Sequence, residues 1–379
     1  MIKIAFMLFT NLSVGAGTEN IIIQYCKNAP PGFDITIVQT DEPRGEMKCT
    51  EECFDGKNVR LLTVKGYDHK FAFFNRSLLG EMLYLFFIQP ILFRILRITA
   101  YRGLYKKMGE PDIIYVVQNH YSTLFEKGPI IIGNTHCWNP IKSGVKSIFT
   151  KLVGRGIFWG RIDYFQVFHH YSWFLLRRKG FVLDNGVDTS IFSPYKTDGS
   201  KKDFVFLGRT EECKGVNIAI EAFKALSPHH SNLYIIGKGS LSGSIKSSNN
   251  IKYLGYLSWE EISKVLNHSG CFVYPTTCDT FALVVLEALA SGLYVIASSY
   301  LKGVFDEFQD LGVLEYCDPS PLEVSKRMEI FLSKDIDNSA FNKAYQLIKE
   351  KYSWNSISNS LYANFLNFIK ERDAEIGNI

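Results

Sequence analysis

The strongest constraint on this 379-residue chain is that short apolar runs alternate with helical segments, and that this alternation starts twice. In the first half we expect strands at residues 2–9, 33–40, 59–64, 112–117, 129–133 and 181–183. In the second half we expect them at residues 204–207, 233–236, 252–256, 271–274 and 294–297. Strands separated by helices favour parallel β-α-β units, and continuous apolar runs are typical of parallel strands buried on both faces. The sequence therefore predicts an α/β protein with two Rossmann-like, doubly wound domains.

The domain boundaries follow from length and from one linker. Domains commonly hold about 100–200 residues, so a chain of this length has room for two or three. The linker is expected within residues 184–200, which are rich in Gly, Pro, Asp and Ser. We predict an N-terminal domain over residues 1–184 and a C-terminal domain over residues 185–352. A helical tail over residues 353–379 is expected to pack back on the N-terminal domain. Such folds bind ligands at the carboxyl ends of their strands, which favours a nucleotide-like ligand in a cleft between the domains.

Composition excludes several classes of protein. The hydrophobic fraction of 46% and the charged fraction of 21% are ordinary for a globular protein. A net charge of +4 is too small for a nucleic-acid-binding surface. The eight cysteines are interpreted as reduced, mostly buried thiols, and the Cys49–Cys53 pair lacks the further ligands that a metal site needs. The first ten residues are expected to be a strand without the basic segment of a signal peptide, so a cytoplasmic protein is predicted.

The longest apolar stretch runs over residues 82–100 and contains Arg94 and Arg97. Each arginine costs about 2.5 kcal/mol or more at the centre of a membrane-spanning helix, so a transmembrane span is not expected. Two interpretations remain open for residues 78–107. The favoured one is a buried helix whose arginines reach the surface. The other is an interfacial helix that holds the protein on the inner face of the membrane.

The first motif lies after the strand expected at residues 204–207. Gly208 ends this strand, and Arg209 and Lys214 follow on the loop before the next helix. Glycine lets the backbone approach a ligand closely, and two cations beside a helix start form a diphosphate site without a metal. The same cations neutralise the charge that develops on a departing nucleoside diphosphate. The alternative interpretation is a pair of solvated cations.

The second motif runs from Asp279 to Gly292, a turn followed by a helix that we expect over residues 281–290. Glu287 lies inside this otherwise apolar helix, which disfavours a surface position. A carboxylate there is suited to bind both hydroxyls of a ribose. The amides of Thr280, Phe281 and Ala282 at the helix start are suited to hold an anion. In the alternative interpretation, Asp279 is only an N-cap and Glu287 only a surface residue.

Together these motifs resemble the retaining GT-B glycosyltransferases of family 4, also called glycosyl transferases group 1. Gly208-Arg209 with Lys214-Gly215 is similar to their G-R-x(n)-K-G loop, and Asp279 with Glu287 to their E-x7-E element. The segment Asn185–Asp188, followed by Phe192-Ser-Pro194, is similar to their interdomain N-G-V-D segment. Ala16-Gly17-Thr18-Glu19 looks like their G-G-x-E loop with its first glycine replaced. The resemblance covers essentially the whole chain and is strongest over residues 181–300.

The resemblance implies roles for individual residues. Arg209 and Lys214 would bind the donor diphosphate, and Glu287 the donor ribose. Asp279 would contact the donor sugar, but it is one methylene shorter than the family's glutamate. Amides of Phe281, Ala282 and Leu283 would bind sugar and phosphate. Gly17 would let the first-domain loop approach the diphosphate.

His136 ends a first-domain strand and resembles the histidine that the family places at its reaction centre. There it would donate a hydrogen bond to a sugar hydroxyl or assist the acceptor. His120 also follows a strand and is a competing candidate. The neighbouring pair His169-His170 falls in residues 163–178, which are interpreted as helical, and has no assigned role.

The predicted reaction is transfer of a sugar, with retention, from a nucleoside diphosphate sugar to the hydroxyl group of a glycan or lipid-linked acceptor. No D-x-D motif ends a strand, so no metal or other cofactor is expected. The alternatives are a nucleotide-sugar epimerase and a non-catalytic nucleotide-sugar-binding subunit. A complete set of Arg209, Lys214 and Glu287 argues against the second. A dehydrogenase is disfavoured because Gly15-Ala16-Gly17 lacks the third glycine of the dinucleotide motif.

Overall fold

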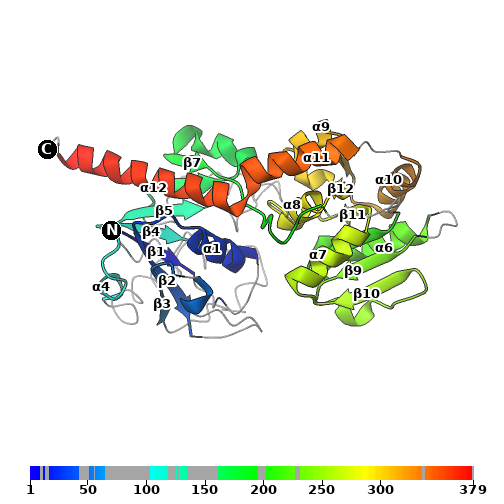
Figure 1. Ribbon diagram of the computed structural model, residues 1–379, viewed down its shortest axis with the longest axis horizontal. Coiled ribbons are helices and arrows are strands. Elements are labelled where there is room, and N and C mark those ends of the chain that lie inside the picture. The colour runs from blue at the N-terminus through cyan, green and yellow to red at the C-terminus, as the bar shows by residue number, and fades with distance from the viewer. Residues whose placement is uncertain are drawn as a thin grey trace, which may run out of the picture. The chain divides into compact units, whose positions relative to one another are not determined.

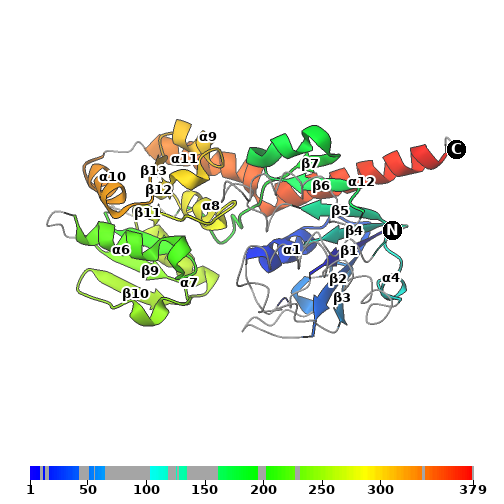
Figure 2. The same cartoon turned by 180° about the vertical axis from the view of Figure 1, so that it is seen from behind.

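The computed structural model describes residues 1–8, 12, 17–41, 51–54, 56–64, 103–117, 125, 128–134, 161–194, 202–226, 231–334 and 338–377. The chain divides into two compact units. The first comprises Met1–Asp184 with Ile357–Ile379, and the second comprises Asn185–Ser356. Each unit is built on a parallel sheet accompanied by helices (Figure 1 and Figure 2). The prediction of two doubly wound α/β domains is therefore confirmed.

The first unit contains a seven-stranded sheet in the order β3-β2-β1-β4-β5-β6-β7, and every pairing is parallel. Its strands are β1 (Ile2–Met7), β2 (Phe33–Thr40), β3 (Val59–Val64), β4 (Ile113–Val116), β5 (Ile130–Asn134), β6 (Tyr164–Val167) and β7 (Gly180–Val182). Up to residue 184, its described helices are α1 (Gly17–Lys27), α4 (Leu104–Lys107) and the 3-10 segments η2 (Glu51–Phe54) and η6 (His169–Arg177). The central strands are buried along most of their length, as a sheet covered on both faces requires.

The second unit contains a six-stranded parallel sheet in the order β10-β9-β8-β11-β12-β13. Its strands are β8 (Phe204–Leu207), β9 (Leu233–Ile236), β10 (Ile251–Gly255), β11 (Cys271–Tyr274), β12 (Tyr294–Ser298) and β13 (Leu314–Cys317). Its α-helices are α6 (Val216–Lys224), α7 (Trp259–His268), α8 (Leu283–Ala290), α9 (Asp306–Asp310), α10 (Pro321–Ser333) and α11 (Asn338–Leu347). Short 3-10 segments η7 (Glu212–Lys214), η8 (Ser242–Ser244) and η9 (Ser299–Leu301) and the π-helical turn η10 (Ile348–Tyr352) complete it.

The structure corrects three local predictions. Strand β6 lies inside residues 163–178, which the sequence pattern indicated as helical. Its Gln166 interrupts the apolar run, yet this side chain is fully buried. It accepts a hydrogen bond from the Tyr115 hydroxyl and donates one to the Tyr25 hydroxyl. Strand β13 was not predicted, because its four residues include a charged side chain. Helix α8 begins at Leu283 and not at Phe281, because the preceding residue has a left-handed backbone conformation.

One helix start was predicted in detail. The sequence predicts a helix over residues 259–267 with Ser258 as its N-cap, because Glu261 stands three residues later at the spacing of a capping box. The amide of Glu261 donates to Ser258 Oγ over 3.3 Å, and the amide of Ser258 donates to Glu261 Oε2 over 2.8 Å. The capping box is therefore confirmed, and it satisfies two amides that would otherwise lack a partner at the helix start.

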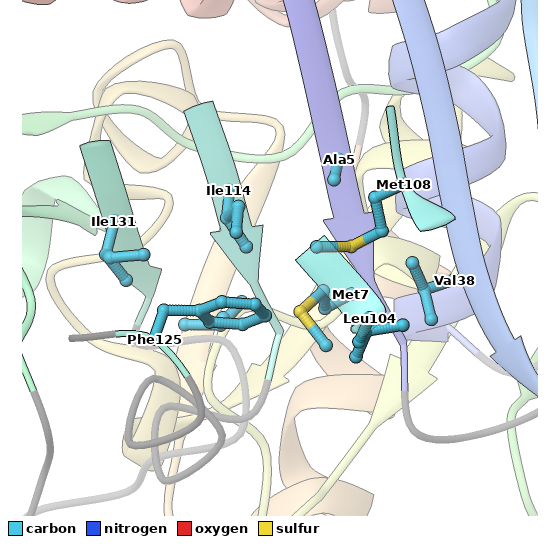
Figure 3. Packing of buried hydrophobic residues seen from close by; sticks show 9 residues of the cluster. Ala5, Met7, Val38, Leu104, Met108, Ile114, Phe125 and Ile131 are labelled. Carbon is cyan, nitrogen blue, oxygen red and sulfur yellow. The ribbon is translucent and has the colours of Figure 1, made fainter. Parts of the chain in front are cut away.

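One core cluster of the first unit bears on residues 78–107 (Figure 3). Leu104 of α4 and Met108 after it pack against Met7 of β1 and Val38 of β2. Leu104 is 4% exposed, while Lys106 and Lys107 are exposed. Within the described part of the segment, residues 103–107, the apolar side chain is thus used by the protein core. Residues 78–102 lie outside the described residues.

The tail forms helix α12 (Trp354–Gly377), which belongs to the first unit from Ile357 onward. Phe368 stacks on Tyr164 with ring centroids 3.8 Å apart, and Tyr362 packs against Phe33 at 4.7 Å. The Tyr362 hydroxyl also donates to the backbone carbonyl of Tyr25. The last helix therefore packs on the sheet with which the chain began (Figure 1). Among the described residues, no helix combines the length and the apolar character needed to cross a bilayer.

This packing predicts unequal effects of two neighbouring substitutions in α12. Phe365 is fully buried, whereas Leu366 is 38% exposed. We expect Phe365→Ala to lower the free energy of unfolding by about 3–5 kcal/mol, because a large buried ring leaves a cavity. Leu366→Ala should change it by about 0.5 kcal/mol. Urea unfolding of both variants measures this difference, and equal effects would contradict the described docking of α12.

Candidate functional site

The candidate site lies where the strand order of the second sheet reverses. Strands β8 and β11 are adjacent and parallel there, with Phe204 opposite Cys271. Connections leave β8 and β11 toward opposite edges of the sheet, so the two following loops meet at this point, which is where open α/β sheets bind ligands. The loop after β8 carries Lys214, and the loop after β11 carries Asp279. Lys214 Nζ donates to Asp279 Oδ2 over 2.6 Å.

The two loops approach so closely that their sequences are constrained. Gly215 has φ of +82°, and a Cβ atom at this position would lie 2.2 Å from the carbonyl oxygen of Pro275. The Cys213 carbonyl accepts hydrogen bonds from the amide and hydroxyl of Thr277 and from the hydroxyl of Thr276. The glycine after Lys214 is therefore required both by its backbone conformation and by its contact with the second loop.

Asp279 is held by four hydrogen bonds. Its Oδ2 atom accepts from Lys214 and, over 2.9 Å, from the Tyr274 hydroxyl. Its Oδ1 atom accepts from the amides of Thr280 and Ala282 over 2.9 and 3.1 Å. Burial acts to raise the pKa of Asp279, but Lys214 and these donors outweigh it and lower the pKa. Asp279 is therefore a carboxylate at neutral pH, and its four lone-pair positions are occupied in this structure.

This arrangement bears on the amides that were predicted to hold a donor. The amides of Thr280 and Ala282 donate to Asp279, so a ligand would have to displace that contact. Ala282 has φ of +53° and is the N-cap of α8, a conformation that costs a non-glycine residue about 1–2 kcal/mol. The Phe281 side chain is 2% exposed and packs against Phe305. Leu283 is the first residue of α8.

Arg209 occupies the same loop as Lys214 but has a different environment. Its residue is exposed, and within the described part of the chain its guanidinium forms no ion pair. Glu211, two residues later, accepts hydrogen bonds from the amide and hydroxyl of Ser240 over 3.1 and 2.6 Å. This contact fixes the loop after β9 to the loop after β8. Gly208, before Arg209, has φ of +153° and lies against the Tyr274 ring.

Glu287 lies in α8, as predicted, and is 6% exposed. Burial raises its pKa to about 8. At neutral pH it is therefore mainly a neutral carboxylic acid, with one O–H donor and free acceptor capacity. The sequence led us to expect a carboxylate, since burial on all sides by α8 and its neighbours is visible only in the tertiary structure.

These loops lie in the part of the chain that is similar in sequence to a known protein family. Residues 187–352 match the family of Glycosyl transferases group 1. The second unit contains a Glycosyl transferases group 1 domain. Every candidate residue of the site above lies within this group 1 domain.

Curated proteins with similar sequences match part of the chain. An uncharacterized glycosyltransferase of Methanocaldococcus jannaschii is 26% identical over 169 residues, 42% of this chain and 43% of its own length. A sucrose synthase of Melioribacter roseus is 31% identical over 199 residues, 47% of this chain and 25% of its own. A phosphatidyl-myo-inositol mannosyltransferase of Propionibacterium freudenreichii is 28% identical over 152 residues, 38% of each chain. The matches thus span less than half of each of these relatives.

Solved structures resemble the chain over nearly its whole length. A sucrose-phosphate synthase from Thermosynechococcus elongatus has a TM-score of 0.72 at 14% identity, and the match covers 98% of this chain and 100% of that one. Anabaena HepE in complex with UDP and glucose has a TM-score of 0.66 at 14% identity, covering 96% and 99%. At this identity the likeness shows the fold alone. The two α/β units of this chain therefore have the GT-B fold.

Several predicted residues belong to the first unit. Gly17 begins α1, and Glu19 of the same motif is buried in this helix. His136, His120 and Ala16 lie outside the described residues, so their predicted roles stay predictions. His169, which had no assigned role, begins η6, and its Nδ1 atom is 2.7 Å from Asp184 Oδ2.

Sequence reasoning missed four residues that build the site in the group 1 domain. Tyr274 binds Asp279, Ser240 binds Glu211, and Cys213 forms a disulfide with Cys278. The disulfide corrects the expectation of reduced thiols for this pair. A signal existed, since Cys213 and Cys278 directly precede Lys214 and Asp279, but the partners are 65 residues apart and nothing in the sequence pairs them.

The buried acid of α8 predicts a pH-dependent stability. The pKa of Glu287 is about 8 in the folded protein and about 4.3 when the chain is unfolded. Between these values the folded protein binds one proton more, so the free energy of unfolding should fall with rising pH by about 1.4 kcal/mol per pH unit. The loss should end above pH 8. Glu287→Gln should remove this contribution.

Denaturant unfolding from pH 5 to pH 8.5 measures the effect. The exposed Glu260 of α7 supplies a matched control, and Glu260→Gln should keep the parent's pH dependence. A parent profile that Glu287→Gln leaves unchanged would show that Glu287 does not carry the proton.

Proposed function

We propose that this protein is a retaining glycosyltransferase that moves a sugar from a nucleoside diphosphate sugar to a hydroxyl group. The observation that carries this proposal is the contact between Lys214 and Asp279 at the strand reversal of a group 1 domain. The contact brings a cation and a carboxylate together on the loops that follow β8 and β11, and the buried Glu287 belongs to the next helix, α8. Such an edge suits a nucleotide ligand, and the residue types suit a diphosphate next to a ribose.

Lys214 and Arg209 would bind the donor diphosphate. The Lys214 ammonium has three N–H donors and uses one in its hydrogen bond to Asp279, which leaves two for phosphate oxygens. Arg209 is exposed on the same loop and offers a planar fork for a second phosphate. Two cations at this site would stabilise the negative charge that grows on the leaving diphosphate. In this proposal they replace a metal ion.

Glu287 would bind the donor ribose, and Asp279 would position the loop. A neutral Glu287 donates one hydrogen bond to a ribose hydroxyl and accepts another. Asp279 orients Lys214 and closes the start of α8 through two amides. The direct contact between Asp279 and the donor sugar, implied by the family resemblance, would require exchange of one of its present hydrogen bonds.

The proposed chemistry needs little from the protein besides position and charge. The anomeric C–O bond to the diphosphate breaks, and the acceptor oxygen attacks from the same face, as the family resemblance implies for retention. The acceptor proton goes to the departing phosphate oxygen. Loops that hold reactants in place account for much of the acceleration in such a step. We propose that Gly17 lets its loop approach the donor diphosphate, and that His136 donates a hydrogen bond to a sugar hydroxyl or assists the acceptor.

The donor, the acceptor and the location in the cell belong to the same proposal. Anabaena HepE has been solved with UDP and with UDP-glucose, which makes UDP-sugars the first donors to test. A glycan or lipid-linked acceptor agrees with the phosphatidyl-myo-inositol mannosyltransferase among the relatives. We propose a cytoplasmic protein in which a buried helix is favoured for residues 78–107, and contact of this segment with the inner face of the membrane is the alternative.

We expect the parent to bind one of UDP, GDP or ADP, and Arg209→Ala and Lys214→Ala to weaken this binding by roughly tenfold or more. Each variant loses at least one charge-assisted hydrogen bond, worth about 1.5–3 kcal/mol. Lys224→Ala removes an exposed lysine at the end of α6 in the same domain and should leave binding unchanged. Calorimetric titration with each nucleotide gives the affinities.

Turnover of the matching sugar donors then separates the alternatives. Transfer to an added acceptor, with retention at the anomeric carbon, supports the proposal. Interconversion of the donor without an acceptor would indicate an epimerase. Nucleotide binding without any turnover would indicate a binding subunit. A nucleotide affinity that neither Arg209→Ala nor Lys214→Ala changes would show that the diphosphate site is misassigned.

A further inference from the structure

We propose that Cys213 and Cys278 form a reversible thiol–disulfide site that controls the affinity of the Lys214–Asp279 site for the donor. The two cysteines are disulfide-bonded, with their Cα atoms 5.5 Å apart. Each directly precedes one member of the ion pair, so the covalent bond joins the same two loops one residue earlier. The effect on the donor rests on the proposed function, whereas the thiol–disulfide site itself does not.

The surroundings of the cysteines in the second unit differ in a way that favours this pair. Cys213 and Cys278 are partly exposed residues, so we expect a small reactant to reach this pair. Cys271 and Cys317 are buried, and burial raises the pKa of both thiols. A thiol of raised pKa in an apolar environment is a poor nucleophile. Oxidation is therefore expected to select the pair beside Lys214.

The chemistry balances with a small disulfide such as glutathione disulfide as the oxidant. One cysteine thiolate attacks a sulfur atom of the reagent, which forms a mixed disulfide and releases one thiol. The second cysteine attacks the bound protein sulfur, which forms the Cys213–Cys278 bond and releases the second thiol. The protein loses two protons and two electrons, and the two released thiols carry them. A dithiol reductant reverses both steps.

The bond acts on loops that are otherwise joined by non-covalent contacts alone. Hydrogen bonds from Thr276 and Thr277 to the Cys213 carbonyl join the loops in either redox state. The disulfide adds a covalent link, which does not open and close as hydrogen bonds do. It therefore holds Lys214 next to Asp279 before a ligand binds. A site ordered in advance loses less entropy on binding. The oxidised protein should therefore bind the donor nucleotide more tightly than the reduced protein.

The experiment compares the full chain after glutathione disulfide and after a dithiol reductant. Alkylation followed by peptide mapping measures which cysteines are free thiols. Cys213 and Cys278 should be unlabelled in the oxidised protein and labelled in the reduced one. Reduction should lower Tm by about 5 °C or more, because a cross-link between residues 65 apart restrains the unfolded chain. The Kd for UDP, or for the nucleotide that binds, should rise about threefold or more.

Two variants and one control complete the comparison. Cys213→Ser and Cys278→Ser should match the reduced parent under both conditions. Cys317→Ala, which removes a buried thiol of the same unit, should keep the parent's response to redox. The reduced parent provides the same test if a variant fails to fold.

The outcomes separate this inference from the proposed function. Labelling of both cysteines in the oxidised protein would overturn the proposed thiol–disulfide site. An equal nucleotide Kd in both redox states would overturn the proposal that this site controls donor affinity. A disulfide that forms and raises Tm in a protein that binds no nucleotide would instead overturn the proposed function, and with it the coupling to the donor.

Discussion

The adjacency of β8 and β11 is the constraint on which the candidate site depends. Strand order reverses between them, so the loops that follow leave in opposite directions and their starting points lie side by side. Lys214 and Asp279 are 65 positions apart in the chain and meet only because of this order. The glycine at 215, the threonine hydrogen bonds and the disulfide all act at the same contact between loops.

Charge and burial give the two acids of the site, Asp279 and Glu287, different protonation states. Asp279 is surrounded by donors, which lower its pKa and keep it a carboxylate that orients Lys214. Glu287 is buried without such compensation, which raises its pKa to about 8 and keeps it neutral. Two residues from one short motif therefore have opposite protonation states at pH 7. A residue with a left-handed backbone, Ala282, connects them at the start of α8.

Sequence patterns predicted the strands with continuous apolar runs and failed where polar side chains are buried. Strand β6 was hidden by Gln166, whose amide is satisfied by partners from other elements. The start of α8 was misplaced by two residues, because a left-handed alanine leaves no mark in hydrophobic periodicity. The capping box at Ser258 was predictable, since both of its hydrogen bonds join residues three positions apart.

The sequence alone determined the two β-α-β series, the group 1 motifs and the candidate residues Arg209, Lys214, Asp279 and Glu287. These properties depend on residue type and short spacing, which a sequence states directly. Only the tertiary structure decided that Tyr274 binds Asp279, that Cys213 bonds to Cys278, and that Glu287 is neutral. Each of these depends on which distant segments surround a side chain, and the order of strands in the folded sheet sets that.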